Sequence, residues 1–193
     1  MIDSKKEIWL MRHGETEWSA KGMHTSRTDL PLLPSGIKQA EELSEKLKGH
    51  KFALVLVSPM QRARETCRLA GYEDVAHVTD DLKEWDYGAY EGRTTAEIRK
   101  ENPTWSLWRD GVLDGEPVDH VGVRVQRVIQ HCLEAPGDVA LFAHGHVLRI
   151  LTAVWLSLAP DRGRLFMLGT GTISILGFEH DYRVIKCWNA LQV

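Results

Sequence analysis

The stretch Ile8-Trp9-Leu10-Met11-Arg12-His13-Gly14 joins four apolar residues to two basic residues and a glycine. The short apolar run predicts a buried strand over residues 8–11. A long segment rich in glycine, threonine and proline then runs to Pro34. Loops of this length without structure of their own are usually functional. The chain therefore places a basic pair, with a candidate reactive histidine, directly after a buried strand.

Strands alternate with helices along most of the remaining chain. The apolar periodicity and the turn residues predict further strands over 53–57, 75–78 and 139–143, helices over 35–48, 59–70, 118–133 and 145–158, and a closing pair of strands over 172–178 and 183–188. Ser35 is expected to cap the first of these helices, and Thr94 with Glu97 forms a predicted capping box on a short helix.

This alternation predicts an α/β fold of three layers, α/β/α, with a mostly parallel central sheet. No internal repeat, low-complexity tract or linker interrupts the 193 residues. Residues 1–193 are therefore expected to form a single domain.

The composition is that of an ordinary globular protein, with 43% hydrophobic and 26% charged residues. A net charge of −3 argues against a general basic patch for nucleic acid. The three cysteines show no paired spacing, the first seven residues are polar, and the apolar run 147–159 is too short and too polar to span a membrane. We therefore expect a cytoplasmic protein.

A candidate catalytic residue follows each of the first four predicted strands. His13 follows the first strand, Arg62 the second, Glu84 the third and His144 the fourth. In open α/β sheets the active site lies outside the carboxyl ends of the strands. If these strands are parallel and adjacent, the four side chains meet in one pocket.

Together these residue types are suited to phosphoryl transfer. A neutral imidazole such as His13 is a nucleophile toward phosphorus that needs no metal. Arg12 and Arg62 can hold a dianionic phosphoryl group with paired donors. A protonated His144, and the first backbone N–H groups of the helix that follows it, would add positive charge. Glu84 can protonate the leaving oxygen and then accept a proton from the attacking water.

Several motifs resemble those of the histidine phosphatase superfamily, in its phosphoglycerate mutase-like branch. They cover most of the chain and stand at residues 10–18 (LMRHGETEW), 28–32 (TDLPL), 36–40 (GIKQA), 58–66 (SPMQRARET), 84–92 (EWDYGAYEG), 114–116 (DGE) and 142–146 (FAHGH). The stretch 18–31 looks closest to the sugar-phosphate and bisphosphate phosphatases of that branch.

The resemblance implies a phosphoglycerate mutase-like fold, a phosphohistidine intermediate on His13 and no cofactor. It implies a phosphate pocket of Arg12, Arg62 and His144, with Glu84 as the acid and base. Further substrate contacts are expected from four residues: Ser19, Thr25, Tyr87 and Gly145. The implied partner is a small phosphorylated molecule rather than nucleic acid or a membrane, and a homodimer is left open.

Hydrolysis is favoured over mutase chemistry. Mutases of this branch carry an extra basic stretch after the Glu-x-x-Tyr-Gly motif, whereas here Gly92 passes directly to Arg93 and a short tryptophan-rich segment. Trp105 and Trp108, together with Tyr90, are expected to shape the mouth of the pocket. Phosphoglycerate mutase-type transfer, a phosphoserine or phosphothreonine protein phosphatase, and a non-catalytic binding relative remain the alternatives.

The other histidines and arginines have simpler interpretations. His146 is expected to be structural and His24 to be a surface or packing residue. Arg64 and Arg68 are expected to form ion pairs with acidic neighbours. No metal site is expected, because among histidine pairs with a ligand-like spacing only His144 and His146 come with a plausible set of carboxylates.

Overall fold

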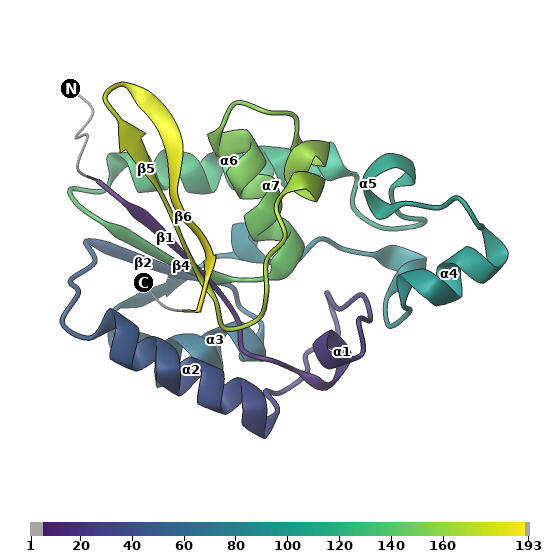
Figure 1. Ribbon diagram of the computed structural model, residues 1–193, viewed down its shortest axis with the longest axis horizontal. Coiled ribbons are helices and arrows are strands. Elements are labelled where there is room, and N and C mark those ends of the chain that lie inside the picture. The colour runs from purple at the N-terminus through teal and green to yellow at the C-terminus, as the bar shows by residue number, and fades with distance from the viewer. Residues whose placement is uncertain (1–5, 192–193) are drawn as a thin grey trace.

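A six-stranded sheet forms the centre of the computed structural model, which describes residues 6–191 (Figure 1). The strands lie in the order β3-β2-β4-β1-β5-β6. The first four are mutually parallel, while β5 runs antiparallel to both β1 and β6. Their bounds are β1 Ile8–Arg12, β2 Leu54–Val57, β3 Ala76–Val78, β4 Val139–Ala143, β5 Ile173–Glu179 and β6 Tyr182–Ala190. The predicted mostly parallel sheet, with a closing pair of strands, is confirmed.

Helices cover both faces of this sheet, as predicted for a three-layer α/β/α fold. Figure 1 shows α2 and α3 on one side and α6 and α7 on the other, while α4 and α5 extend beyond the sheet. The α-helices are α1 Glu17–Ala20, α2 Pro34–Leu47, α3 Gln61–Leu69, α4 Thr95–Glu101, α5 Leu107–Asp110, α6 Val118–Glu134 and α7 Gly145–Trp155. Short 3-10 turns are η1 Glu73–Val75, η2 Asp80–Leu82, η3 Gly88–Tyr90 and η4 Pro160–Leu165.

The apolar run of β1 is explained by the two cores on either side of the sheet. Successive side chains of a strand point to opposite faces. Ile8 and Leu10 pack into the core beneath α6 and α7, and Trp9 and Met11 pack into the core beneath α2 and α3. A strand covered on both faces needs apolar residues at every position.

The pairing of β1 with β4 brings two distant histidines together. Arg12 is in register with Ala143, and the backbone N–H of His13 donates to the carbonyl of Ala143 at 3.0 Å. Both strands end at the same edge of the sheet because they are parallel. His13 and His144 therefore leave the sheet side by side.

Several predicted boundaries shift by a few residues. Ser35 does not cap α2: the helix begins at Pro34, whose fixed φ suits a first helical position, and the Ser35 hydroxyl donates to Glu15 instead. Helix α3 begins at Gln61 rather than at 59, and α7 ends at Trp155 rather than at 158. The long loop after His13 also contains the one-turn helix α1, with a capping box between Thr16 and Ser19 that the sequence analysis missed.

Two glycines let α2 approach the loop that carries His13. A Cβ atom on Gly36 would lie 2.2 Å from the carbonyl oxygen of Glu15, and one on Gly14 would lie 2.2 Å from the carbonyl oxygen of Gly36. Neither backbone segment can move away from such a Cβ atom without displacing the other segment. The start of α2 therefore fixes the position of the histidine loop.

Gly36→Ala should destabilise the protein by about 1–3 kcal/mol, because the added methyl overlaps backbone atoms. We expect a lower midpoint in urea unfolding, measured by circular dichroism. Lys38→Ala, at an exposed position of the same helix, is the matched control and should change stability by less than about 0.5 kcal/mol. Equal midpoints for the two variants would contradict the proposed close contact.

Candidate active site

A cavity of about 260 Å³ opens at the carboxyl ends of β1 and β4. Seven of the nine predicted site residues line it: Arg12, His13, Ser19, Thr25, Glu84, Tyr87 and Gly145. Residues that the sequence did not assign to a site also line it: Gly22, Met23, His24, Thr95, His146, Arg149 and Leu168. The two remaining predicted residues, Arg62 and His144, are fully buried and are not among the lining residues.

His13 presents one free nitrogen to this cavity. Its Nδ1 lies 2.7 Å from the carbonyl oxygen of Gly14, which can only accept, so the ring proton resides on Nδ1. Nε2 then carries the lone pair. Burial, followed by the charges of Arg62 and Arg12, holds the pKa of His13 well below its ordinary value. The imidazole is therefore neutral, as a nucleophile must be.

Arg12 lies beside His13 with an unsatisfied donor. Its Nη1 donates to the carbonyl of Leu168, whereas its Nε has no hydrogen-bond partner within residues 6–191. A Cβ atom on Gly145 would come within 3.3 Å of the guanidinium, so the glycine leaves space for it. Arg12 lines the cavity, whereas its Nε is a buried donor whose missing partner costs free energy.

Arg62 is more fully occupied than the sequence analysis expected. Its Nε donates to Nδ1 of His144 at 3.1 Å, and its Nη1 to the carbonyl of Thr28 at 3.1 Å. Its Nη2 donates to the carbonyls of Ser26, at 3.1 Å, and Thr25, at 3.4 Å. Most of its donors thus order the loop beside the cavity, and direct contact with phosphate stays a prediction.

His144 is neutral in this arrangement, in contrast to the protonated form expected from the sequence. Nδ1 accepts from Arg62, so the proton lies on Nε2 and is donated to the hydroxyl of Ser58 at 2.7 Å. Burial, followed by the neighbouring charge of Arg62, holds the pKa of His144 well below its ordinary value. Its ring centre lies 5.2 Å from that of His13.

Glu84 lines the same cavity, and backbone donors hold its side chain in place. Its carboxylate accepts from the N–H groups of Trp85 at 2.9 Å, His146 at 2.9 Å and Val147 at 2.8 Å. Two of these donors are the first-turn N–H groups of α7, which lack partners within the helix. The sequence analysis assigned such donors to the phosphate, but the structure shows that they fix the acid-base candidate.

The hydroxyls of Ser19 and Thr25 line the cavity but already bond to the backbone. Ser19 Oγ donates to the carbonyl of Thr16 at 3.0 Å, and Thr25 Oγ1 donates to the carbonyl of Met23 at 3.0 Å. Each oxygen retains acceptor capacity. Their predicted donation to phosphate would require these hydroxyls to rotate.

Two histidines that were expected to be structural or packing residues line the cavity. Burial lowers the pKa of His24 to about 4. His146 Nδ1 lies 2.6 Å from the hydroxyl of Tyr87. A signal was present in the sequence, because His146 and Arg149 are three residues apart and so share one face of the helix.

Neither Trp105 nor Trp108 is among the residues that line the cavity. Trp105 is 2% exposed, so its predicted place at the pocket mouth is wrong. Trp108 is half-buried and lies under the guanidinium of Arg149, 4.7 Å from its ring centre. Its indole fits over Gly163, where an added Cβ would come within 2.8 Å of the ring. Trp108 therefore supports a cavity residue from behind.

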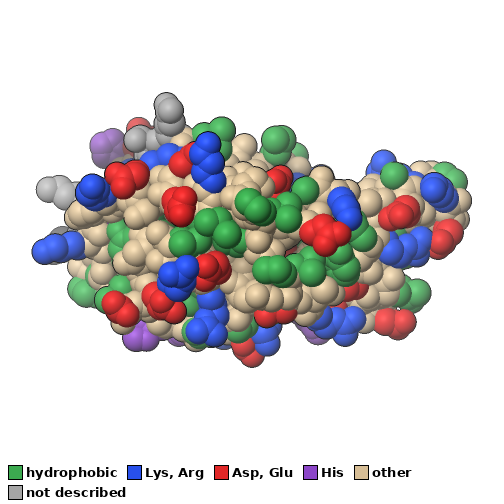
Figure 2. Space-filling model, turned by 90° about the horizontal axis from the view of Figure 1, so that it is seen from below, with side chains coloured by type: hydrophobic (Ala, Val, Ile, Leu, Met, Phe, Trp, Pro, Cys, Tyr) green, Lys and Arg blue, Asp and Glu red, His purple; other side chains and the backbone are tan. Residues whose placement is uncertain are grey.

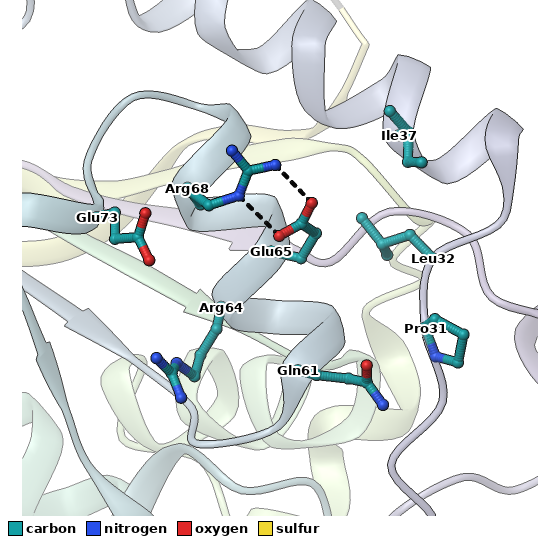
Figure 3. Close-up of a pocket in the computed structure, with 8 residues that line it drawn as sticks. All are labelled: Pro31, Leu32, Ile37, Gln61, Arg64, Glu65, Arg68 and Glu73. Atoms are coloured by element: carbon teal, nitrogen blue, oxygen red, sulfur yellow. Dashed lines mark hydrogen bonds and ion pairs between the residues drawn. The ribbon is translucent and has the colours of Figure 1, made fainter.

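A second groove lies between α2 and α3, away from these histidines (Figure 3). Arg68 and Glu65 form the predicted ion pair across one side of it, at 2.7 Å. Arg64 extends away from that pair and makes no ion pair within residues 6–191. Basic and acidic side chains are interspersed over the face of the molecule seen from below (Figure 2).

Neither a metal cluster nor a membrane-spanning helix is found in the described part of the chain. No group of three or more His, Cys, Asp or Glu side chains is gathered as metal ligands. No helix is both long and apolar enough to cross a bilayer.

A family model described as the histidine phosphatase superfamily, branch 1, matches residues 8–191. This protein belongs to the histidine phosphatase superfamily. Arg12, Glu84 and Gly145, which line its cavity, stand in motifs that carry the resemblance. The predicted family is confirmed.

Several proteins that this chain is similar to are phosphatases by name, and others are named as probable phosphoglycerate mutases. An acid phosphatase of Mycobacterium tuberculosis is 41% identical, with 91% of this chain and 88% of the relative covered. A sedoheptulose 1,7-bisphosphatase of Saccharomyces cerevisiae is 38% identical, with 79% and 68% covered. A solved structure of an open reading frame product from M. tuberculosis has a TM-score of 0.88 at 37% identity, with 95% and 97% covered. The predicted class, a phosphatase acting on phosphomonoesters, is confirmed.

The lowered pKa of His13 gives a direct prediction for this histidine phosphatase. We expect the His13 imidazole to stay neutral, with its proton on Nδ1, as the pH falls through its ordinary midpoint of 6.5. Nitrogen-15 NMR of the imidazole rings measures both the charge and the tautomer. The urea-unfolded chain, in which burial and the arginines no longer act, is the control. Titration of His13 at or above pH 6.5 in the folded protein, or a proton on Nε2, would contradict the geometry.

Proposed function

We propose that this protein hydrolyses a small phosphorylated metabolite, a sugar phosphate or related phosphomonoester, without a metal and through a phosphohistidine on His13. The observation that carries this proposal is the free, neutral Nε2 of His13, held in a cavity that Arg12 and Glu84 also line. Nucleophile, anion donor and acid-base group thus face one small space.

The first half of the reaction transfers the phosphoryl group to the protein. With the phosphoryl oxygens beside Arg12, the Nε2 lone pair of His13 attacks phosphorus in line with the ester oxygen. The P–N bond forms, the P–O ester bond breaks, and a protonated Glu84 gives its proton to the departing oxygen. Arg12 stabilises the charge on the equatorial oxygens.

The second half returns the site to its starting state. The Glu84 carboxylate accepts a proton from a water molecule, whose oxygen attacks phosphorus. The P–N bond breaks, inorganic phosphate leaves, and His13 recovers its neutral form. Arg62 and His144, which lie behind the cavity, hold the loop and the neighbouring ring in place.

The size and charge of the cavity support a small anionic substrate. A volume of about 260 Å³ lies just below the usual range for drug-sized ligands, ~300–1,000 Å³. Arg149 adds a second cation to the cavity wall, and burial lowers its pKa. A sugar phosphate with a further anionic group fits this arrangement, and the yeast relative is by name a bisphosphatase. A cavity of this size is less suited to a phosphorylated protein segment.

We also infer that residues 1–193 form one domain and that the protein works in the cytoplasm. The three cysteines are free, and burial raises the pKa of the Cys67 and Cys132 thiols to about 12, so these two thiols are unreactive. Free thiols are typical of a reducing compartment. A homodimer stays a prediction.

A screen of phosphorylated metabolites tests the proposed activity. The panel holds sugar monophosphates, sugar bisphosphates, both phosphoglycerates and a phosphoserine peptide, and phosphate release and isomer formation are measured together. We expect phosphate release from a sugar phosphate, unaffected by a chelator, inhibited by vanadate and lost in His13→Ala. Isomer formation without phosphate release would contradict hydrolysis, and full activity of His13→Ala would contradict the nucleophile.

Glu84→Gln should slow alkyl phosphates far more than aryl phosphates. An alkoxide needs a proton to leave, whereas an aryloxide leaves without one, and general acid catalysis contributes roughly 10²–10⁴-fold. The measurement is kcat/KM for a matched pair of substrates. Glu101→Gln, at an exposed position on α4, is the control and should change neither value. Equal losses on both substrates would mean that another group is the acid.

A further inference from the structure

The side chain of His146 lies in the cavity but has no part in the mechanism above. Its ring packs against aromatic neighbours on one side, with ring centres 5.2 Å from Trp108, 5.7 Å from Tyr87 and 6.2 Å from Trp85. The side chain of His146 is 20% exposed, and it lines the cavity. One edge of the imidazole therefore remains available to a ligand.

The contact with Tyr87 settles which nitrogen of His146 carries the proton. Tyr87 is buried, and burial together with Glu84 raises the pKa of its phenol well above the ordinary value, so the hydroxyl keeps its proton. Within residues 6–191 that hydroxyl has one partner, Nδ1 of His146 at 2.6 Å. The phenol donates, Nδ1 accepts, and a neutral imidazole must then hold its single proton on Nε2.

Burial and the neighbouring charges favour the neutral form of the His146 imidazole. Burial, followed by the charge of Arg149, holds the pKa of His146 well below its ordinary value. The other charged groups around the ring are Glu84, whose Oε2 lies 4.0 Å from Nδ1, and Arg12. The site thus offers a neutral N–H group rather than a cation.

The Nε2–H of His146 points to space that a ligand can reach. It makes no hydrogen bond within residues 6–191. Among residues 6–191, Nε of Arg12 is the one buried side-chain nitrogen or oxygen that lacks a hydrogen-bond partner. Nε2 of His146 also lacks a partner, so it is not a buried atom. Nε2 is therefore accessible, and the cavity provides the access.

This donor lies on the leaving-group side of the site. The backbone N–H of His146 donates to Oε2 of Glu84 at 2.9 Å, so the imidazole sits next to the group that would protonate the departing oxygen. A second neutral imidazole, that of His24, lies 6.3 Å away between ring centres. Neutral N–H donors pair with hydroxyl oxygens and give no charge attraction to a carboxylate or phosphate.

We propose that Nε2–H of His146 binds a hydroxyl group of the leaving alcohol and so selects phosphomonoesters of polyols over esters of simple alcohols. This inference rests on the proposed function, since it concerns the alcohol that the phosphatase releases. A site built to hydrogen-bond a hydroxyl disfavours an analogue that lacks it, because the bound analogue covers the donor and leaves it unpaired.

A matched pair of substrates tests the proposal: glycerol 1-phosphate and n-propyl phosphate, which share the ester carbon chain and differ in two hydroxyls. We expect the wild-type protein to show the higher kcat/KM for glycerol 1-phosphate. His146→Phe keeps an aromatic ring against the tryptophans and removes the donor. It should lower the preference by about 2- to 12-fold, the range for one neutral hydrogen bond.

Two further variants separate recognition from packing. His146→Gln retains an N–H donor and should restore part of the preference. His131→Phe, at an exposed position on α6, is the control and should leave both substrates unaffected.

Three outcomes would overturn the proposal. The first is an equal loss on both substrates in His146→Phe without recovery in His146→Gln. A wild-type protein that releases phosphate without preferring the polyol ester would overturn it and leave the proposed function standing. No phosphate release from any monoester would overturn both.

Discussion

The parallel pairing of β1 with β4 is the constraint on which the site depends. The register that sets Arg12 against Ala143, and the hydrogen bond from the His13 N–H to the Ala143 carbonyl, deliver His13 and His144 to the same edge of the sheet. Their residues are 131 positions apart in the chain, and no local structure could bring them together. The apolar faces of both strands hold that register, because a slip of one residue would exchange the two cores.

Positive charge surrounds neutral imidazoles at this edge. Burial, followed by the guanidiniums of Arg62 and Arg12, lowers the pKa of His13 and keeps its lone pair available. Arg62 also connects His144 with the loop around Ser26, so one buried side chain orders two walls of the site. Glu84 lines the same cavity and is held by backbone donors from α7. The same arginine charges that would attract an anion therefore add to the effect of burial on the nucleophile.

The sequence predicted what depends on strong patterns and missed what depends on packing. The apolar run at β1 and the capping box at Thr94 were sufficient to place those elements, since hydrophobic periodicity and cap chemistry are local. The burial of Trp105 depends on how the α4–α5 segment folds back, which no local pattern encodes. Likewise the place of His146 in the cavity depends on the rotation of α7, and the occupied donors of Arg62 on the path of a distant loop.

The central claim is that His13 carries the phosphoryl group during turnover. It is tested most directly by quenching a reaction with ³²P-labelled substrate within milliseconds and mapping the labelled peptide. The account predicts an acid-labile phosphoryl group, about one per chain, on the peptide that contains His13. Label confined to another residue, or no labelled protein while substrate is being hydrolysed, would contradict it.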